Sequence, residues 1–473
     1  MNGYGISMPD ADTIAAIATA PGAGGVGIIR ISGPKAHEIL LSMFRPDSSS
    51  FKDFIPRMLH HGSVLDSEGR VADDALAVLF KGPHSFTGED CAEIQGHGGP
   101  AVLSALLESV LSRGARMAER GEFSRRAFLN GRMELSQAEA VAELIAAPSR
   151  EGVYLASAKL EGLLGRRVEE LRDRLEYLRQ RICLAVDFPD EEAECLPAHE
   201  FTGITEEVAS GIRVLLAGYE RARCWSEGAL VVLAGEVNAG KSSIMNAFLG
   251  RKRAIVTEQP GTTRDYLEEQ TMLSGLPVRL VDTAGLREES QDAIELEGIR
   301  RGQELAGNAR CILLVLDGAR CAGVSPHSLE LFQTERKLAE ELGKERCIAV
   351  WNKSDIYPLP ESLKDFYGVP LISVSASEGW GIEELAAAVR TCCLQENGIP
   401  EEGEIAPNIR QASQLRKALE ALQALKDAIE DFVPPDLCGI HLDAACACLA
   451  DITGLNTTEE TLNAIFSSFC IGK

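Results

Sequence analysis

Apolar residues recur at helical spacing in stretches that lie far apart along the chain. In residues 150–185 they are three or four positions apart, and residues 200–225 show a similar spacing. This spacing places apolar residues on one face of a helix. After residue 407 the pattern resumes in one long helix and two short ones. These stretches predict one helical bundle that residues 228–390 interrupt. The first and third stripes are Leu160, Leu164, Val168, Leu171, Leu175, Leu178 and Ile182, and Leu415, Leu419, Leu422, Leu425 and Ile429.

Residues 228–390 change to a pattern of short apolar runs. Each run has the length of a strand, and helical stretches separate several of them, which is typical of a doubly wound α/β sheet. The predicted strands are Ala229–Ala234, Val278–Val281, Cys311–Leu316, Cys347–Trp351 and Pro370–Val374. This segment is therefore predicted to be an α/β domain inserted into the helical bundle.

The first 147 residues predict an α+β domain. Its expected strands are 13–18, 26–31, 75–80 and 91–95, and its expected helices are 100–112 and 124–147. The predicted fold class is multidomain α/β and α. The predicted domains are an N-terminal α+β domain at 1–147, a helical domain in two parts at 148–227 and 391–473, and the inserted α/β domain at 228–390.

Composition excludes some classes of protein. The chain has 473 residues and a formal net charge of -24, because 71 Asp and Glu outnumber 47 Lys and Arg. A hydrophobic fraction of 45% excludes a chain that is disordered throughout. Each predicted domain is net acidic, which argues against a protein coated in positive charge that binds nucleic acid non-specifically. Any RNA partner must be held by a few placed groups or by a second protein.

Cysteine usage and hydropathy predict a cytoplasmic protein. The 13 cysteines form no C-x-x-C pair and no cluster with zinc spacing, as expected of reduced thiols. The sequence contains no run of about 18 apolar residues, so no membrane span is expected. Residues 1–12 lack the basic and apolar regions of a signal peptide.

A phosphate-binding loop is predicted between a strand and a helix. Gly235-Glu-Val-Asn-Ala-Gly-Lys-Ser242 fits the pattern G-x-x-x-x-G-K-[ST], follows the strand Leu230–Ala234 and precedes the helix Ser243–Leu249. The glycines let backbone N–H groups surround phosphates. Lys241 can reach the β- and γ-phosphate oxygens, and the Ser242 hydroxyl can bind Mg²⁺.

Two later segments are predicted to reach the metal and the γ-phosphate. Asp282-Thr-Ala-Gly285 follows an apolar strand, so Asp282 can hold the metal through water and Gly285 can offer its N–H to the γ-phosphate. Gly261-Thr-Thr-Arg-Asp lies between this motif and the phosphate loop. Thr263 can supply a second Mg²⁺ ligand from a loop that becomes ordered when triphosphate binds.

A guanine site is predicted from two further segments. Asn352-Lys-Ser-Asp355 ends an apolar strand, and the Asp355 carboxylate can accept both the ring N–H and the amine of guanine. Adenine lacks this pair of donors, so GTP is favoured over ATP. Ser375-Ala-Ser377 follows another strand and suits the guanine carbonyl. The five motifs, in this order, resemble those of the Ras-like GTPase superfamily.

The residue after the Asp-x-x-Gly motif departs from many of these GTPases. They have a Gln there that orients the attacking water, whereas this chain has Leu286, which cannot hydrogen-bond to water. Either hydrolysis is slow, or other groups orient the water and supply a positive charge. Asn238 is a candidate, because its side-chain oxygen can bind a monovalent cation beside the phosphates, where the cation acts as an arginine finger does.

Motifs outside the α/β segment extend the resemblance from Asp12 to Lys473. They are Asp12-Thr-Ile-Ala-Ala-Ile-Ala-Thr, Gly25-Val-Gly-Ile-Ile-Arg-Ile-Ser-Gly33, Ser85-Phe-Thr-Gly-Glu-Asp90, Gln95-Gly-His-Gly-Gly-Pro100, Gly121-Glu-Phe-Ser, Arg126-Ala-Phe-Leu-Asn, Gln137-Ala-Glu-Ala-Val, Asp187-Phe-Pro-Asp-Glu-Glu and Phe466-Ser-Ser-Phe-Cys-Ile-Gly-Lys473. With them the chain resembles the MnmE (TrmE) family of tRNA-modification GTPases.

The resemblance implies a homodimer with three kinds of domain: an N-terminal dimerisation domain that binds folate, a helical domain and a GTPase domain. It also implies that K⁺ drives association of the GTPase domains and supplies the finger charge. The implied K⁺ ligands are Asn238, Thr257, Gln259 and Thr262. The implied water-orienting acid is Glu295, with Glu288, Glu289 and Asp292 as alternatives because the chain has one extra residue between Gly285 and Gly298.

The candidate site residues follow from the motifs and the resemblance. The catalytic candidates are Glu295, Lys241 and Asn238, and the Mg²⁺ candidates are Ser242 and Thr263. The GTP site comprises Asn238, Ala239, Gly240, Lys241, Ser242, Ser243, Thr257, Glu258, Gln259, Pro260, Gly261, Thr262, Thr263, Asp282, Thr283, Ala284, Gly285, Asn352, Lys353, Asp355, Ser375 and Ala376.

The implied folate contacts are Arg30, Glu93, Arg132 and Lys473. Cations and a carboxylate suit a pterin edge and an acidic glutamyl tail. The family often has Lys at position 132 and Arg at position 23, where this chain has Arg132 and Ala23. Cys470 lies in the implied folate region, where both a chemical role and simple packing remain open.

The resemblance implies an enzyme that acts with an MnmG (GidA)-like partner, which uses FAD and NADH. Together they would add an aminomethyl or carboxymethylaminomethyl group to C5 of the wobble uridine of certain tRNAs. 5-Formyl-tetrahydrofolate or another tetrahydrofolate derivative would supply the carbon, and the isolated chain would bind tRNA weakly. The alternative is a regulatory or ribosome-assembly GTPase, which explains residues 228–390 equally well and predicts no folate binding.

Overall fold

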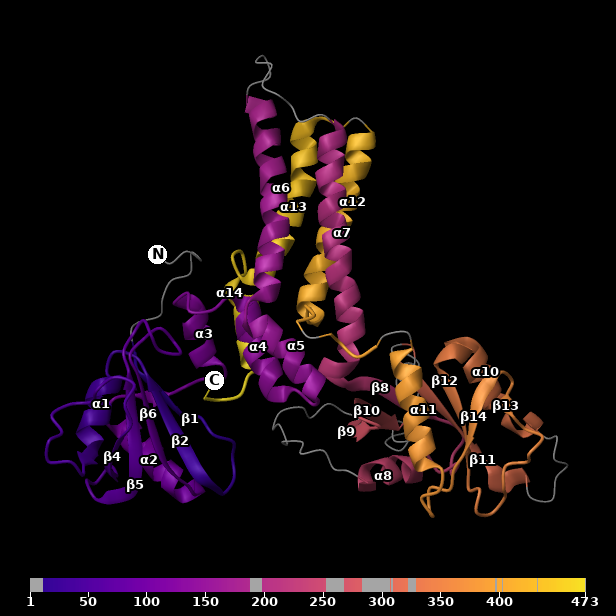
Figure 1. The fold of residues 1–473 in the computed structure, drawn as a ribbon, viewed down its shortest axis with the longest axis horizontal. Helices are drawn as coiled ribbons and strands as arrows, with labels where there is room; N and C mark the ends of the chain where they lie inside the picture. The colour runs from indigo at the N-terminus through magenta and orange to yellow at the C-terminus, as the bar shows by residue number, and fades with distance from the viewer. Residues whose placement is uncertain are drawn as a thin grey trace, which may run out of the picture. The chain divides into compact units, whose positions relative to one another are not determined.

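The computed structural model describes residues 12–187, 198–251, 268–282, 307, 309–321, 329–395, 398–401, 403–431 and 433–472 (Figure 1). The chain divides into two compact units. The first consists of residues 1–145, 157–214 and 409–473, and the second of residues 146–156 and 215–408. Each unit therefore contains segments that are far apart in sequence. No helix among the described residues is both long enough and apolar enough to cross a membrane.

A seven-stranded sheet forms the N-terminal part of the first unit, in the order β3-β4-β5-β6-β2-β1-β7. Its longest strands pair antiparallel, with Arg30 opposite Glu93 on β2 and β6. The core beneath the sheet contains Ile29, Ile31 and Leu106. The strands are β1 (Ile14–Ile17), β2 (Gly24–Ser32), β3 (Phe44–Pro46), β4 (His60–Leu65), β5 (Val71–Phe80), β6 (Cys91–Gly98) and β7 (Arg116–Met117), and the helices are α1 (Ala36–Met43), α2 (Pro100–Ser112) and α3 (Glu122–Leu129).

Long helices form the rest of the first unit. The predicted apolar stripe of α6 is buried, since Leu164, Val168, Leu171, Leu175 and Leu178 are each at most 4% exposed. In Figure 1, α6, α12 and α13 run side by side, and α13 packs against both of the others. The helices are α4 (Leu135–Ala146), α5 (Arg150–Leu160), α6 (Leu163–Asp187), α7 (Ala198–Arg223), α12 (Ile409–Glu430), α13 (Pro435–Thr453) and α14 (Glu459–Ser467). Three of them, α4, α5 and α7, contribute residues to both units.

Two helices that the sequence predicted as continuous are divided. The helix predicted at 150–185 is α5 and α6, and Gly162 between them has φ of 78°. The helix predicted at 124–147 is α3 and α4, with Gly131 at φ 68° between them. Positive φ ends a right-handed helix, and glycine adopts it without steric cost. Those two predictions were therefore wrong at the glycines.

The second unit is built on a mainly parallel sheet in the order β13-β14-β12-β11-β8-β10-β9. The five central strands, β14, β12, β11, β8 and β10, pair parallel with their neighbours. The edge strands β9 and β13 pair antiparallel. Apolar clusters lie on both faces of the sheet, which explains the uninterrupted apolar runs of its central strands. The strands are β8 (Ala229–Ala234), β9 (Glu268–Leu273), β10 (Leu276–Asp282), β11 (Cys311–Asp317), β12 (Cys347–Asn352), β13 (Asp365–Phe366) and β14 (Val369–Ser373), and the helices are α8 (Lys241–Arg251), α10 (Gln333–Leu342) and α11 (Ile382–Leu394).

The predicted fold class is confirmed. An α+β sheet domain, a helical bundle and a doubly wound α/β sheet are all present. The strand order of the second sheet reverses at β8. The next parallel strand in sequence, β10, lies on one side of β8, and β11 lies on the other side. Ligands of such sheets bind at the carboxyl ends of the strands near this reversal. The predicted phosphate loop directly follows β8.

Candidate functional site

The phosphate loop, Gly235–Ser242, joins β8 to α8. Three of its residues have positive φ: Gly235 at 147°, Asn238 at 64° and Gly240 at 96°. The loop is closely packed at Gly235, where a Cβ atom would lie 2.5 Å from the carbonyl oxygen of Val315 on β11. A side chain at this position would displace the strand beside the loop, which is why the motif requires glycine there.

Lys241 is buried, with 5% of its surface exposed. Its Nζ donates to the carbonyl oxygens of Gly235 at 2.9 Å and of Glu236 at 2.8 Å. These two bonds hold the ammonium group within the curve of the loop. The arrangement suits a lysine whose charge binds phosphate oxygens as a fixed point charge.

Ser242 and Asp282 meet beside the phosphate loop. The Ser242 hydroxyl donates to Oδ2 of Asp282 at 2.7 Å, although 40 residues separate the two. Asp282 ends β10 and is 6% exposed. A hydroxyl and a carboxylate are the hard oxygen ligands that Mg²⁺ prefers. The residues present therefore fit the metal that the sequence predicted here.

The predicted base-binding residues lie in the loops after β12 and β14. Asp355 is exposed, and its Oδ1 accepts a hydrogen bond from the buried Ser375 hydroxyl at 2.6 Å. This bond restricts the orientation of the exposed carboxylate. The backbone N–H of Ala376 donates to Oδ1 of Asn352 at 3.3 Å. The two base loops are thus bonded to each other.

The base loops are also bonded to the phosphate loop. Asn352, 2% exposed, donates from Nδ2 to the carbonyl oxygen of Ala239 at 2.9 Å. Lys353 donates from Nζ to the carbonyl oxygen of Asn238 at 3.0 Å and to Oδ2 of Asp317 at 2.8 Å. A change at either loop will therefore affect the other.

Asp317 was missed by the sequence reasoning. It is the last residue of β11, and a polar residue that directly follows an apolar strand was the signal that could have identified it. Other predicted residues lie outside the described residues. They are Thr257, Glu258, Gln259, Pro260, Gly261, Thr262, Thr263, Thr283, Ala284, Gly285, Glu295 and Lys473.

A second group of predicted residues lies in the first unit, around Arg30 of β2. Arg30 donates from Nε to Oε1 of Glu93 at 2.9 Å and from Nη1 to the carbonyl oxygen of Gly472 at 3.4 Å. Its guanidinium carbon lies 5.2 Å from the ring centre of Phe86 and 5.9 Å from that of Phe123. The group combines a cation, a carboxylate and two aromatic rings around one half-buried arginine.

Arg132 lies against the loop that carries Phe86. Its Nε donates to the carbonyl oxygen of Ser85 at 3.0 Å. Arg132 shares no hydrogen bond with Arg30, so among the described residues it joins this group through the loop at 85–90. Phe86 and Phe123 were not predicted as site residues, although both belong to motifs of the family.

The C-terminal tail packs beside the same group. The backbone N–H of Gly121 donates to the carbonyl oxygen of Cys470 at 3.4 Å, and a Cβ atom on Gly472 would lie 2.5 Å from the carbonyl oxygen of Ile17. The Cys470 side chain is exposed. Backbone contacts therefore hold the tail next to Arg30, and the thiol of Cys470 is accessible.

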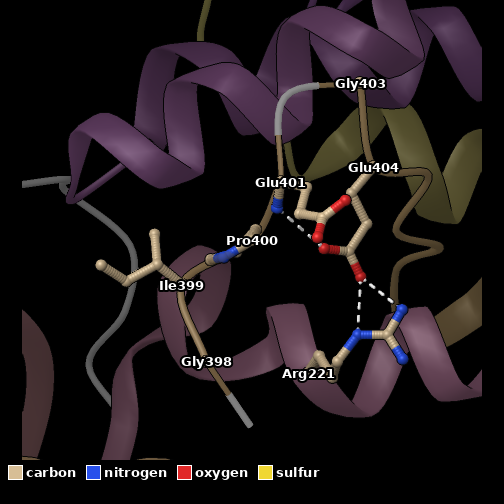
Figure 2. Close-up of a pocket in the computed structure, with 7 residues that line it drawn as sticks. All are labelled: Arg221, Gly398, Ile399, Pro400, Glu401, Gly403 and Glu404. Atoms are coloured by element: carbon tan, nitrogen blue, oxygen red, sulfur yellow. Dashed lines mark hydrogen bonds and ion pairs between the residues drawn. The ribbon is translucent and has the colours of Figure 1, made fainter.

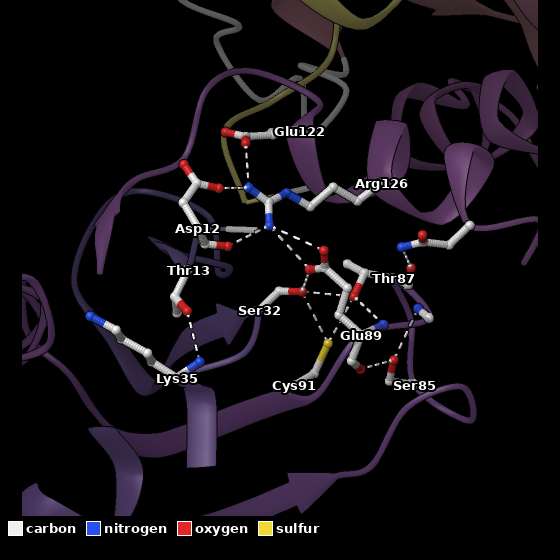
Figure 3. Close-up of polar contacts among 12 residues, drawn as sticks. Asp12, Thr13, Ser32, Lys35, Ser85, Thr87, Glu89, Cys91, Glu122 and Arg126 are labelled. Carbon is white, nitrogen blue, oxygen red and sulfur yellow. Dashed lines mark hydrogen bonds and ion pairs between the residues drawn. The ribbon is translucent and has the colours of Figure 1, made fainter. Parts of the chain in front are cut away.

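A buried polar network fixes the loop at 85–90, as Figure 3 shows. Arg126, 7% exposed, pairs with Asp12 at 2.5 Å, Glu122 at 2.9 Å and Glu89 at 3.1 Å. Oε2 of Glu89 also accepts the Ser32 hydroxyl at 2.7 Å. Four motifs of the N-terminal domain thus meet at one guanidinium group.

The charges in this network shift the pKa values of its carboxyl groups. Burial of Glu122 acts to raise its pKa, but hydrogen bonds from Arg116, the Glu119 amide and Arg126 outweigh burial and lower it. The pKa of Asp12 is lowered in the same way, because bonds from Arg126 and Arg116 outweigh its partial burial. Both carboxyl groups are therefore ionised at neutral pH.

Two other features carry no predicted site residue. A cavity of about 470 Å³ lies between the end of α7 and residues 398–401, 403 and 404, and Arg221 and Glu404 form an ion pair there at 2.6 Å (Figure 2). On the first unit, exposed Asp47, His61 and Asp74 form the one group with metal-like spacing among the described residues. Both ring nitrogens of His61 already contact a carboxylate, at 2.6 and 3.2 Å, so this group is a surface ion-pair cluster.

The sheet order and the second unit's loops together define a Ras-like GTPase. The phosphate loop follows the central strand, a hydroxyl and a carboxylate meet at its end, and a base loop with an acidic residue lies beside it. The N-terminal region matches the model of the GTP-binding protein TrmE N-terminus over residues 13–132, and residues 135–470 match the model of the MnmE helical domain. The chain belongs to the MnmE family of GTPases.

Curated relatives agree over nearly the whole chain. The tRNA modification GTPase MnmE of Nitratidesulfovibrio vulgaris (strain DP4) is 54% identical over 98% of this chain and 100% of its own length. The protein of the same name from Lawsonia intracellularis is 48% identical over the same shares. Among solved structures, a putative nucleolar GTP-binding protein 1 from Plasmodium falciparum covers 36% of this chain and 87% of its own at 18% identity and a TM-score of 0.27. That likeness is too distant to add to the fold, which rests on the strand order.

Proposed function

We propose that this chain hydrolyses GTP as part of an enzyme that modifies the wobble uridine of certain tRNAs. The relatives that carry the name tRNA modification GTPase align from end to end with this chain, which supports the same activity here. The observation that carries the proposal is the coexistence of a guanine-nucleotide site and the Arg30 group in one chain. A GTPase that acts only as a regulatory switch needs the guanine-nucleotide site but not the Arg30 group.

At the nucleotide site, we propose that Mg²⁺ is held by Ser242 and Thr263, with Asp282 acting through water. The 2.7 Å contact of Ser242 with Asp282 supports this arrangement. Lys241 would bind the β- and γ-phosphate oxygens, and Asp355 would accept the two guanine donors. When bound there, Mg²⁺ would supply positive charge that offsets the negative charge of the phosphates during hydrolysis.

Hydrolysis is proposed to require K⁺ and association of two GTPase domains. Leu286 cannot orient water, so the proposed acid is Glu295, and the proposed K⁺ ligands are Asn238, Thr257, Gln259 and Thr262. Asn238 has an exposed side chain on the phosphate loop, which suits a cation site there. Turnover should rise strongly in KCl over NaCl at equal ionic strength. Equal rates in the two salts would refute the cation account.

We propose that the Arg30 group binds 5-formyl-tetrahydrofolate or another tetrahydrofolate derivative. The pair of Arg30 with Glu93 offers donors and acceptors to a pterin edge, and Phe86 and Phe123 offer aromatic faces. Arg132 and Lys473 would bind the acidic glutamyl tail. The folate would supply the one-carbon unit. The backbone of the tail contacts Gly121 and Arg30, and substitution of the exposed Cys470 tests whether its thiol has a chemical role.

The folate proposal is tested by calorimetric titration of the dimeric protein with 5-formyl-tetrahydrofolate. Saturable heat is expected from the wild type, and its loss is expected in Arg30→Ala. Arg45→Ala on β3 is a matched control, because this arginine is exposed and lies outside the group. If the folded wild-type dimer releases no heat, the alternative function as a regulatory or ribosome-assembly GTPase is favoured.

The remaining parts of the proposal concern partners and location. We propose a cytoplasmic homodimer with the domain bounds 1–147, 148–227, 228–390 and 391–473, which acts with an MnmG (GidA)-like protein that holds FAD and uses NADH. The net charge of -24 supports weak tRNA binding by the isolated chain, with the partner supplying most of the positive surface. Tight binding of tRNA by the isolated chain at physiological salt would contradict this part.

A further inference from the structure

Glu335 lies in the first turn of α10, and 1% of its surface is exposed. Its Oε1 accepts a hydrogen bond from the backbone N–H of Glu236 at 3.0 Å. Glu236 is the second residue of the phosphate loop. Neither α10 nor Glu335 belongs to the motifs that identified the nucleotide site, so this contact attaches the loop to a part of the fold without an assigned role.

The same peptide group is bound from both sides. The N–H of Glu236 and the carbonyl of Gly235 belong to one trans peptide, so they point in opposite directions. Glu335 accepts from the N–H, and Lys241 donates to the Gly235 carbonyl at 2.9 Å. The buried carboxyl of Glu335 therefore sets the orientation of a carbonyl group that holds the phosphate-binding lysine.

A second contact holds the side chain of Glu236. Its carboxylate pairs with Arg320, which lies in the turn after β11. The guanidinium carbon of Arg320 lies 5.8 Å from the ring centre of the buried Phe332. Both members of this pair are 38% exposed, so solvent screens it. The buried contact from Glu335 is the stronger of the two constraints on Glu236.

The buried carboxyl group of Glu335 does not serve the stability of the fold. Its Oε2 is buried and has no hydrogen-bond partner among the described residues. Burial raises the pKa of this carboxyl group, because the charged form is less stable away from water. A buried polar atom without a partner destabilises a fold, and an apolar side chain would avoid that cost. What an apolar side chain cannot provide is an acceptor for the N–H of Glu236.

We propose that Glu335 is a positioning residue for GTP binding: by accepting the N–H of Glu236 it fixes the peptide whose carbonyl orients Lys241. Without the acceptor, this peptide can rotate and Lys241 loses one of its two carbonyl partners. Nucleotide affinity should then fall roughly tenfold, as expected when one buried N–H is left unpaired. Most of the loss should appear as faster dissociation, because the loop closes on the phosphates less firmly.

The test measures dissociation constants and dissociation rates of fluorescent mant-GDP with the full-length chain. Glu335→Leu removes the acceptor, Glu335→Gln keeps an acceptor oxygen without the charge, and Glu335→Asp keeps the charge but withdraws it by one methylene. Leu and Asp should both weaken binding roughly tenfold, and Gln should stay within about twofold of the wild type. Glu340→Leu is the control, since Glu340 lies on the same helix and pairs with Arg336 at the exposed surface.

A merely structural role would give a different pattern. It would lower the melting temperature of Glu335→Leu while the folded protein bound mant-GDP with wild-type affinity, and that result would overturn the proposal. If Leu does not fold, the comparison of Asp with Gln decides. If Glu335→Gln binds mant-GDP weakly and Glu335→Asp binds it fully, the charge matters and the position of the acceptor does not. That result would also overturn the proposal.

Discussion

Gly240→Ala should disturb the nucleotide site for a steric reason. A Cβ atom on Gly240 would lie 2.1 Å from Nδ2 of Asn352, and the residue has φ of 96°, where side chains are strained. Asn352 is 2% exposed and donates from that Nδ2 to the carbonyl oxygen of Ala239. The added methyl group therefore displaces the amide that joins the base loop to the phosphate loop.

The magnitude follows from two separate costs. A buried amide that loses its hydrogen bond costs about 1–3 kcal/mol. A non-glycine residue in left-handed backbone costs roughly 1–2 kcal/mol. Together they amount to about 2–5 kcal/mol, and nucleotide binding requires the displaced geometry. The dissociation constant for GDP should therefore rise at least about 30-fold, the lower end of this range.

The assay is mant-GDP titration of the full-length variant, with a thermal melt to show that it is folded. Gly250→Ala is the matched control. Gly250 lies in α8, no neighbouring atom lies within 4 Å of its added Cβ, and alanine is the better helix former by about 1 kcal/mol. This control should bind normally and melt no lower than the wild type. A folded Gly240→Ala protein whose dissociation constant stays within threefold of the wild type would refute the reasoning.

Three further predictions follow from the structure. Asp355→Asn should weaken GDP binding about 100-fold or more and favour binding of XDP, because xanthine presents a carbonyl where guanine presents an amine. Competition against mant-GDP measures this preference, and an unchanged preference for GDP would contradict the base assignment. Arg126→Ala should destabilise the N-terminal domain by about 3–5 kcal/mol, since it removes a buried guanidinium group from Glu89, Asp12 and Glu122, of which the last two keep only Arg116 as a charged partner. By contrast, Arg70→Ala, at an arginine whose side chain is 69% exposed, should change stability by less than about 1 kcal/mol in urea denaturation. The pKa of Glu122 is lowered in the fold, so its stabilisation is present above its unfolded pKa and is lost as pH falls through the lower folded value. Denaturation of the wild type should therefore become easier below about pH 4.5. Arg126→Ala should make this dependence shallower without abolishing it, because Arg116 still lowers the pKa of Glu122.

The sequence predicted the second unit better than the first. Strand β8 has the bounds that the apolar run predicted, because a strand buried on both faces is apolar throughout. Edge strand β9 and strand β4 were missed, since Glu268–Leu273 and His60–Leu65 begin with polar residues. The break at Gly162 was missed because the apolar stripe keeps its phase across it. Spacing alone does not report the sign of φ.

The candidate site was predictable where a motif carries the chemistry. Lys241 and Ser242 begin α8 after the loop that follows β8, Asp282 ends β10, and Asp355 lies in the loop after β12, as their order in sequence required. Glu335 was not predictable, because a glutamate in a helix that also contains Arg336 and Lys337 reads as a solvated side chain. Only the tertiary structure shows its burial and its contact with the phosphate loop. The Arg126 network was missed for the same reason, since Arg126 joins Glu89 and Asp12, which are 37 and 114 residues away in sequence.

Nucleoside mass spectrometry tests the central claim most directly. The full-length dimer is incubated with an MnmG (GidA)-like partner, tRNA, a tetrahydrofolate derivative, NADH and GTP in K⁺ buffer, with Lys241→Ala as the matched control. The account predicts that a 5-aminomethyl- or 5-carboxymethylaminomethyl-uridine forms at the wobble position with the wild-type chain, and that little or none forms with the variant. Wobble uridine that stays unmodified while the same dimer hydrolyses GTP would contradict it.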